Sequence, residues 1–150
     1  MKKLRLQTGS NIVEFALILP LLLVLVSGIV DLGLALYDKA VITNAAREGA
    51  RFGMVFGEAS IPGGGRPTPL QIIARVNQYL GIDATHPKGY LVNFGPPNLT
   101  ILPVFDPTSP NSGDKLTVTV TYTYHHYVML ITSLKGTTSN LSSVSVMRLE

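Results

Sequence analysis

One uninterrupted apolar segment constrains this chain more than any other feature. Residues 15–30 read FALILPLLLVLVSGIV without a charged side chain, and Glu14 and Asp31 stand at the two ends. With its flanks the segment is long enough, as a helix, to cross a hydrocarbon layer of about 30 Å. A chain of 150 residues rarely buries a helix that is apolar on every side. A cleaved secretory signal needs a small-residue cleavage site, which Ser27 and Gly28 imitate only weakly. We therefore predict a membrane anchor.

The net positive charge of the chain is confined to its first residues. The chain has twelve Lys and Arg residues and nine Asp and Glu residues. Three of the twelve basic residues are Lys2, Lys3 and Arg5. Residues 10–150 therefore carry nine side chains of each sign, and their Lys and Arg form no clustered basic stripe of the kind that nucleic-acid binding needs. Positive charge before an apolar span keeps the N-terminus in the cytoplasm. We expect a single-pass protein of the cytoplasmic (inner) membrane, with the N-terminus inside and the C-terminal domain outside.

The residues just before the span form a recognisable pattern. The basic leader MKKLRLQTG ends in Gly9, Ser10 follows, and Glu14 stands at the head of the apolar helix. This order resembles the type IV prepilin signal. The resemblance implies that a prepilin peptidase cuts between Gly9 and Ser10, and that Glu14 becomes the fifth residue of the mature chain. A carboxylate there can neutralise the new terminal amine of a neighbouring subunit when helices pack side by side.

Two further stretches narrow the resemblance. Residues 13–33 read VEFALILPLLLVLVSGIVDLG, residues 44–51 read NAAREGAR, and the C-terminus reads SVMRLE. Together they resemble the TadE-like pseudopilins, or minor pilins, of tight-adherence (Tad) type IV pilus systems, densely over residues 9–53 and again over residues 116–150. The family implies a part in assembly, priming or capping of a Tad pilus, with incorporation into an extracellular pilus and adhesion as further expectations. Its implied partners are the prepilin peptidase, other pilins and Tad assembly-platform proteins. It implies no enzymatic activity.

The anchor and the NAAREGAR segment are predicted to form one long helix from about Asn11 to Gly53. Pro20 would bend this helix or remove one backbone hydrogen bond, which neighbouring helices in a membrane tolerate. Ala45, Gly49 and Gly53 recur every four residues and share one face, where two backbones can approach closely. This stripe either contacts another subunit or packs against the chain's own domain, and we favour the second interpretation.

Charged residues on the same helix suggest a local ion pair. Arg47 and Arg51 lie four residues apart, and Glu48 stands three residues before Arg51, within reach on a helix surface. The same residues could instead be solvated separately.

The rest of the chain predicts a small α+β domain. Thr68, with Pro69 and Gln71, forms a capping box that begins an amphipathic helix ending at Gly81. Three strand patterns follow, at 99–105, 115–127 and 144–149. Pro103 breaks the first, and in the second apolar residues and threonines alternate cleanly. Residues 128–134 are apolar and fit either a short helix or a strand. We expect a pilin-like fold with a 3-4-stranded antiparallel sheet, divided as leader 1–9, transmembrane and assembly helix 10–53, and extracytoplasmic domain 54–150.

No catalytic, cofactor or metal site emerges from the sequence. The chain lacks cysteine, which excludes disulfides and thiolate chemistry. The run Pro62–Pro67 lacks the Lys and Ser or Thr of a phosphate loop. His86, His125 and His126 have no carboxylate at ligand spacing, and we predict surface or edge roles for them. We expect no cofactor and no small-molecule substrate.

Two other classes of function remain beside the pilin. One is an uncleaved bitopic anchor that displays a binding or adhesion module, with Glu14 incidental. The other is an exported hydrolase, which needs an acid–base constellation that the sequence does not reveal.

Overall fold

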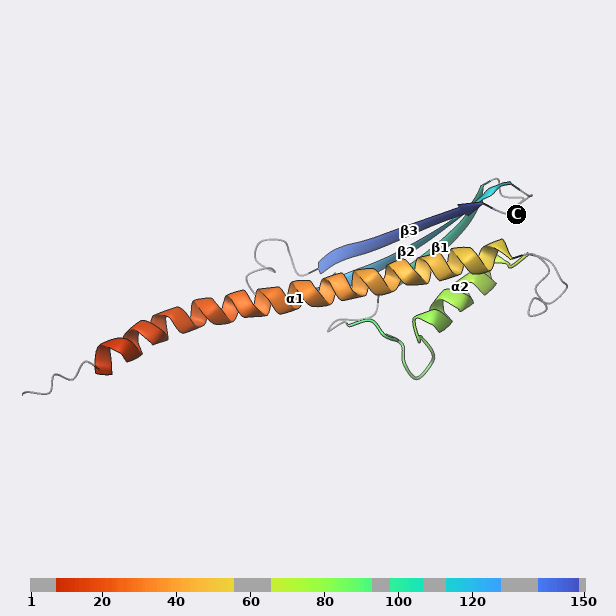
Figure 1. Cartoon of the computed structure of the whole chain (residues 1–150). Helices are drawn as coiled ribbons and strands as arrows, with labels where there is room; N and C mark the ends of the chain where they lie inside the picture. The colour runs from red at the N-terminus through yellow and green to blue at the C-terminus, as the bar shows by residue number, and fades with distance from the viewer. Residues whose placement is uncertain (1–7, 56–65, 93–97, 107–112, 128–137, 149–150) are drawn as a thin grey trace, which may run out of the picture.

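A single helix runs through most of the length of the molecule. The computed structural model describes residues 8–55, 66–92, 98–106, 113–127 and 138–148. Helix α1 spans Thr8–Met54 without interruption, with Pro20 inside it, and Figure 1 shows it curving gently. The prediction of one long helix is confirmed. Several predicted features lie outside the described residues: the start of the leader, the glycine run at 63–65 and the ambiguous segment 128–134.

The second helix begins and ends where its sequence signals predict. Helix α2 spans Pro69–Tyr79, and Thr68 caps it in a complete capping box with Gln71. After the C-cap residue Leu80, Gly81 adopts a φ of +68°. Glycine adopts this left-handed conformation without the steric cost of a Cβ, so it terminates the helix.

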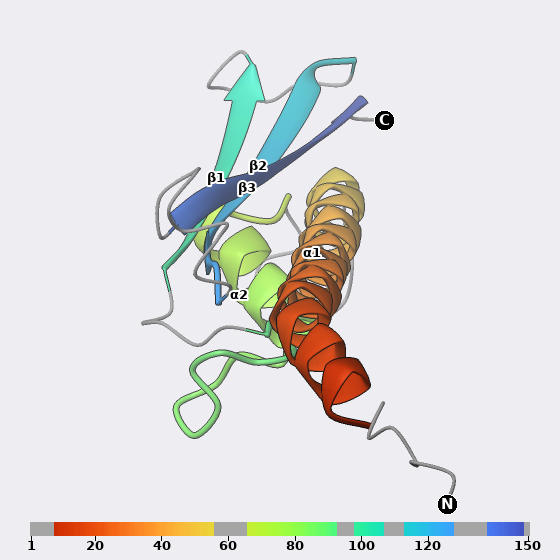
Figure 2. The same cartoon turned by 90° about the vertical axis from the view of Figure 1, so that its left-hand side faces the viewer.

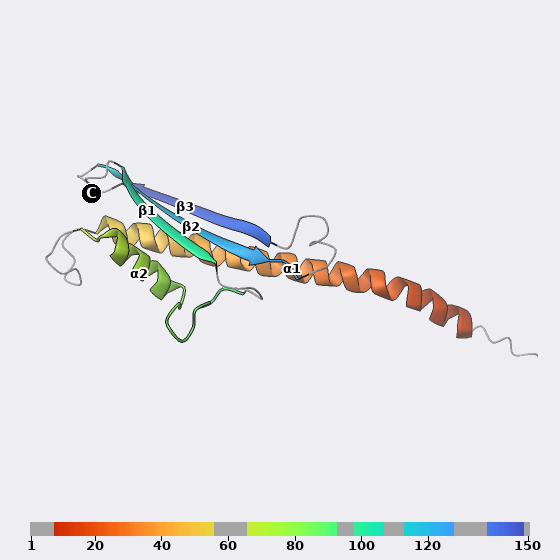
Figure 3. The same cartoon turned by 180° about the vertical axis from the view of Figure 1, so that it is seen from behind.

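Three described strands form one antiparallel sheet in the order β1-β2-β3: β1 at Leu99–Asp106, β2 at Lys115–His125 and β3 at Thr138–Arg148. Both helices lie on the same side of this sheet, and the strands run lengthwise along the later part of α1 (Figures 1 and 3). The α+β architecture is thereby confirmed: a long N-terminal apolar helix, a short helix and an antiparallel sheet.

Two strand predictions were wrong in detail. Pro103 does not break the first strand, because β1 continues through it and pairs Pro103 with Val118. β1 is an edge strand, where a residue without an N–H is tolerated if its nitrogen faces the open side. The last strand begins at Thr138 rather than Val144. Its first half is mostly polar, so it lacks the apolar alternation that would have marked it.

The core lies between the inner face of the sheet and the two helices. Apolar residues of β2 alternate inward as predicted and are fully buried, and they meet small residues of α1 and aliphatic residues of α2. β3 turns small side chains inward, since Ser143 and Ser145 are buried while Val144 and Val146 face outward. Figure 2, seen from the N-terminal end of α1, shows the sheet on one side of both helices, and the two serines lie on the face of β3 that packs against α1.

Candidate functional site

The head of α1 carries the predicted processing residues. α1 begins at Thr8, so Gly9 and Ser10 belong to its first turn. Glu14 follows Ser10 by four residues, about one helical turn, and its side chain is exposed. Pro20 is exposed as well. These residues stand on a part of the helix that the described domain does not contact.

The apolar segment that follows is bare. Within α1 an 18-residue window reaches a mean hydropathy of 2.6, with none of it buried against the rest of the chain. By length and composition this helix can cross a membrane.

The small-residue stripe packs against the chain's own domain. Ala45 is fully buried. A Cβ added to Gly49 would lie 2.5 Å from Val76 of α2, and one added to Gly53 would collide with Leu116 of β2. The glycines therefore let α1 approach both α2 and the sheet, which favours the intramolecular interpretation of this stripe.

The charged residues of the same segment border a groove between α1 and α2. Glu48 pairs with Arg75 of α2, with 2.8 Å between Oε1 and the guanidinium, and Arg75 also lies 5.9 Å from the ring centre of Phe52. Arg47 and Arg51 are exposed, and Arg51 lines the groove. The structure thus joins Glu48 to the second helix instead of to Arg51.

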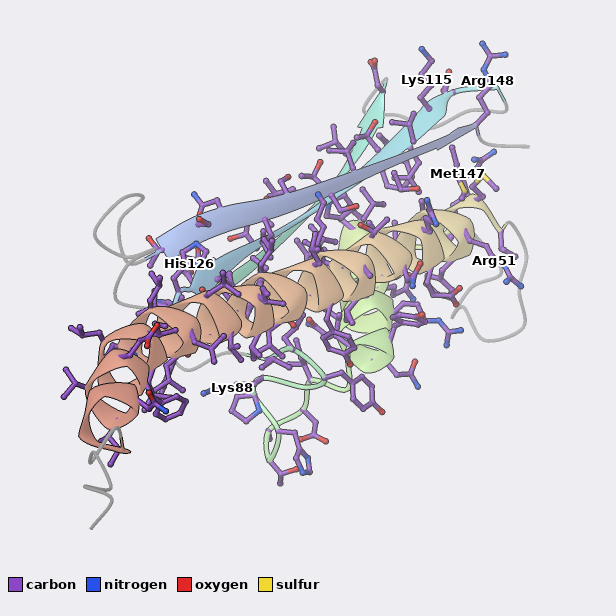
Figure 4. The ribbon with its side chains drawn as sticks, turned by 60° about the vertical axis from the view of Figure 1, so that its left-hand side comes forward. Arg51, Lys88, Lys115, His126, Met147 and Arg148 are labelled. Atoms are coloured by element: carbon purple, nitrogen blue, oxygen red, sulfur yellow. The ribbon has the colours of Figure 1, made fainter. Side chains whose placement is uncertain are left out.

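A buried polar cluster lies where α1 meets the domain. The Asp31 side chain is only 1% exposed and accepts hydrogen bonds from the Tyr124 hydroxyl at 2.9 Å and the Tyr127 N–H at 3.2 Å. Its Oδ2 lies 3.1 Å from Nδ1 of His126, whose Nε2 lies 2.7 Å from the Ser139 hydroxyl. Burial, and then the hydrogen bond to Asp31, raises the pKa of Tyr124 above its usual range. Figure 4 places His126 at the end of the sheet beside α1.

The order of Asp31, His126 and Ser139 is the order of a serine-hydrolase relay. Such a relay acts only beside an oxyanion hole and a substrate pocket. The groove described above lies elsewhere, along Glu48 and Arg75. The hydrogen bonds of the cluster join Tyr124 of β2 and, through His126, Ser139 of β3 to Asp31 of α1, as a structural clamp does.

Two more α1 side chains hold the domain. Asp38 is fully buried and accepts the Val92 N–H at 2.9 Å, and burial raises its pKa to about 6. Asp38 lies beyond the apolar segment. Lys39 donates a hydrogen bond to the Ser142 carbonyl of β3.

The contacts of Asp31, Asp38 and Lys39 with the domain were not predicted from the sequence. The surface or edge role predicted for the histidines is confirmed for His86, whereas the His126 side chain is only 10% exposed and belongs to the buried cluster. A signal did exist: Asp31, Ala35, Asp38 and Ile42 follow a three-to-four residue spacing and lie on one face of α1. Two acids on that buried face required partners elsewhere in the chain.

These features define a class: a protein whose single long apolar helix fits membrane anchoring and carries a small α+β domain packed directly on it. The family model described as TadE-like protein matches residues 9–51. The resemblance to this family is thereby confirmed over residues 9–51. It spans Gly9 to Arg51, nearly the whole of α1. Comparison with curated proteins gave no match, and comparison with solved structures gave none either.

Proposed function

We propose that this protein is a minor pilin, or pseudopilin, that takes part in the assembly, priming or capping of a Tad pilus after cleavage by a prepilin peptidase. The supporting observation is the position of Gly9, Ser10 and Glu14 at the head of a bare apolar helix, within the segment that the TadE-like family model matches.

The proposal assigns a role to each part of the chain. Residues 1–9 are a leader whose positive charge holds the helix in the inner membrane with its N-terminus inside. Residues 10–53 are the transmembrane and assembly helix, whose part before Asp31 spans the membrane and later leaves the bilayer for a bundle of pilin helices. Residues 54–150 form the domain outside, which contacts other pilins or assembly-platform proteins. The proposed role is structural rather than enzymatic.

Glu14 has a specific part in this proposal. Cleavage before Ser10 creates a terminal amine one helical turn from the Glu14 carboxylate. Leaving water for an apolar bundle is costly for either charge alone, so an amine and a carboxylate of neighbouring subunits stabilise each other there.

Intact-mass measurement of the membrane-extracted protein tests the proposal. In cells with an active prepilin peptidase, the expected species begins at Ser10. Gly9→Val should leave the chain uncut, while Gly28→Val, the same exchange deeper in the helix, should be processed normally. A wild-type chain that still carries Met1, or normal processing of Gly9→Val, would contradict the processing step. The first of these results would instead favour an uncleaved bitopic anchor.

A further inference from the structure

The outer face of the sheet, which points away from α1 and α2, carries an apolar patch. Four aliphatic side chains on it are each more than half exposed. We call it the outer-face patch, and it consists of Leu102 and Val104 of β1, Val144 and Val146 of β3, and Thr117 and Thr119 of β2 between them. The strand register groups these residues into two adjacent rows, Leu102–Thr119–Val144 and Val104–Thr117–Val146.

The rows on either side of the patch are polar. Asp106, Lys115 and Arg148 form the next row toward the end of the sheet far from the N-terminus of α1, and Figure 4 shows Lys115 and Arg148 together at that end. The row on the other side is Thr100–Thr121–Ser142. An apolar centre with a polar rim is typical of a protein-protein contact.

Membrane anchoring restricts what can cover this face. The strands run lengthwise along α1 (Figure 3). A partner anchored in the same membrane with the same topology must present its own domain with α1 pointing in the same direction. A two-fold axis parallel to α1 satisfies this condition and brings two outer faces together with their strands aligned, as in a β-sandwich.

We propose that a second copy of this chain covers the outer-face patch, forming a parallel two-fold dimer about an axis in front of β2. This inference needs the membrane anchor but not the pilus role. In this arrangement β2 faces β2 of the second copy, and β1 faces β3. The aliphatic residues of β1 then meet the valines of β3 at the same height.

The charges at the rim favour this particular axis. Asp106 and Arg148 stand in one row on opposite sides of β2. The two-fold axis therefore sets Asp106 of each copy against Arg148 of the other, giving two opposite-charge contacts. Among the described residues of the rim, Lys115 is the charged one that meets its own counterpart, and it lies exposed there. Two opposite-charge contacts outweigh one like-charge contact at an exposed rim.

Pairing through the sheet edges is disfavoured by the same reasoning. Antiparallel pairing of β3 with β3 of another copy needs an axis perpendicular to the sheet, which would point the two anchors in opposite directions. Parallel pairing of β3 with β1 of the next copy would place Pro103, which has no N–H, in the new ladder.

Crosslinking of single-cysteine variants tests the dimer in the full chain, reconstituted alone in lipid vesicles. The chain has no cysteine of its own. Thr119→Cys places a thiol on the central strand in front of the axis, so a short bismaleimide should join two copies. Ala74→Cys is the control, because Ala74 is exposed on α2, on the other side of the sheet. We expect dimer from the first variant and only collisional background from the second.

Charge reversal then tests the identity of the partner. In the Thr119→Cys background, Asp106→Arg or Arg148→Asp should each lower the crosslinked yield about fivefold, because each creates like-charge contacts at the rim. The double exchange should restore the yield, since it only swaps the two signs. Far-ultraviolet circular dichroism of each variant verifies folding. A Thr119→Cys yield equal to that of Ala74→Cys, or a folded double variant that stays at the low yield, would overturn the proposal. Because no other pilus protein is present, these outcomes do not depend on the proposed function.

Discussion

The two halves of α1 are parts of one helix but have opposite surroundings. Between Asn11 and Val30 the side chains are mostly large and exposed, as with Leu17 at 75% and Leu21 at 71%. Between Asp31 and Met54 the face toward the domain is lined mainly by small residues, and Ala46 and Ala50 are fully buried. The first half needs lipid or other helices to cover it, whereas the second half is covered by its own sheet. The change in side-chain size therefore marks the boundary between the part of the helix suited to a membrane and the part that packs on the domain.

The largest expected effect comes from filling the close approach in the second half. Gly53→Leu would drive a side chain into Leu116 and Ile72, which should lower the free energy of unfolding of the domain by about 3 kcal/mol. Near-ultraviolet circular dichroism of the tyrosines, followed during thermal unfolding in detergent micelles, measures this change. Gly28→Leu is the matched control in the first half, because nothing lies within 4 Å of its added Cβ. Equal destabilisation by both variants would erase the proposed difference between the halves.

The second largest expected effect is a difference between Asp31 and Glu14, the acids at the two ends of the apolar segment, in what their removal costs the stability of the domain. Asp31→Ala removes the acceptor of the Tyr124 hydroxyl and the Tyr127 N–H, and we expect a loss of about 2 kcal/mol in the stability of the domain. Glu14→Ala should leave that stability unchanged, since the Glu14 side chain is exposed. Denaturant unfolding of the two variants in the same micelles makes the comparison. A neutral Asp31→Ala would show that the buried cluster does not clamp the domain.

Asp38, in the second half of α1, should give the stability of the domain a pH dependence. Its pKa is raised by burial from 3.8 to about 6, so the folded state holds the proton more tightly than the unfolded state. Stability from this group is therefore present at low pH and is lost as the pH rises through this interval, by about 1 kcal/mol per pH unit. Asp38→Asn, which keeps an acceptor for the Val92 N–H, should flatten the curve. Unfolding midpoints measured between pH 3.5 and pH 7 test this pH dependence. Parallel curves for wild type and Asp38→Asn would refute the assignment to Asp38.

The smallest effect is expected from the ion pair at the far end of α1. Arg75 is partly exposed, so Glu48→Gln should cost only about 0.5 kcal/mol. Arg51→Gln, on the same helix and lining the same groove, should cost less still. A double-mutant cycle of Glu48→Gln with Arg75→Gln measures the coupling between the two side chains, and a coupling near zero would remove this pair from the contacts that hold α2 to α1.

Local signals predicted the helices better than the sheet. The capping box at Thr68 and the glycine at position 81 depend on neighbouring residues only, so α2 could be bounded from the sequence. The alternation of β2 also reports its own burial. The start of β3 could not be predicted from the sequence, because pairing with β2 holds its polar residues in the sheet, as when Thr138 pairs with His125. Long-range partners decide such a segment, and no local pattern encodes them.

The candidate sites divide in the same way. Gly9, Ser10 and Glu14 were predicted from spacing along the chain, which needs no tertiary structure, and their processing role stays a prediction. The cluster around Asp31 was missed because its members lie more than 90 residues apart in sequence, as with Tyr124 and Asp31. Spacing along one helix could have shown two acids on an otherwise apolar face, but not their partners. Tyr124 and His126 meet Asp31, and the Val92 N–H meets Asp38.

We expect the first half of α1 to lie in the membrane and the second half, which packs on the domain, to lie outside it. The most direct test labels single cysteines along α1 in intact membranes with a membrane-impermeant maleimide. Leu21→Cys and Val26→Cys in the first half should stay unlabelled until the membrane is dissolved. Asn44→Cys, exposed on the second half, should be labelled from outside the membrane without detergent. Labelling of Leu21→Cys as fast as Asn44→Cys in sealed membranes would contradict a spanning first half, and with it the division of α1 at Asp31.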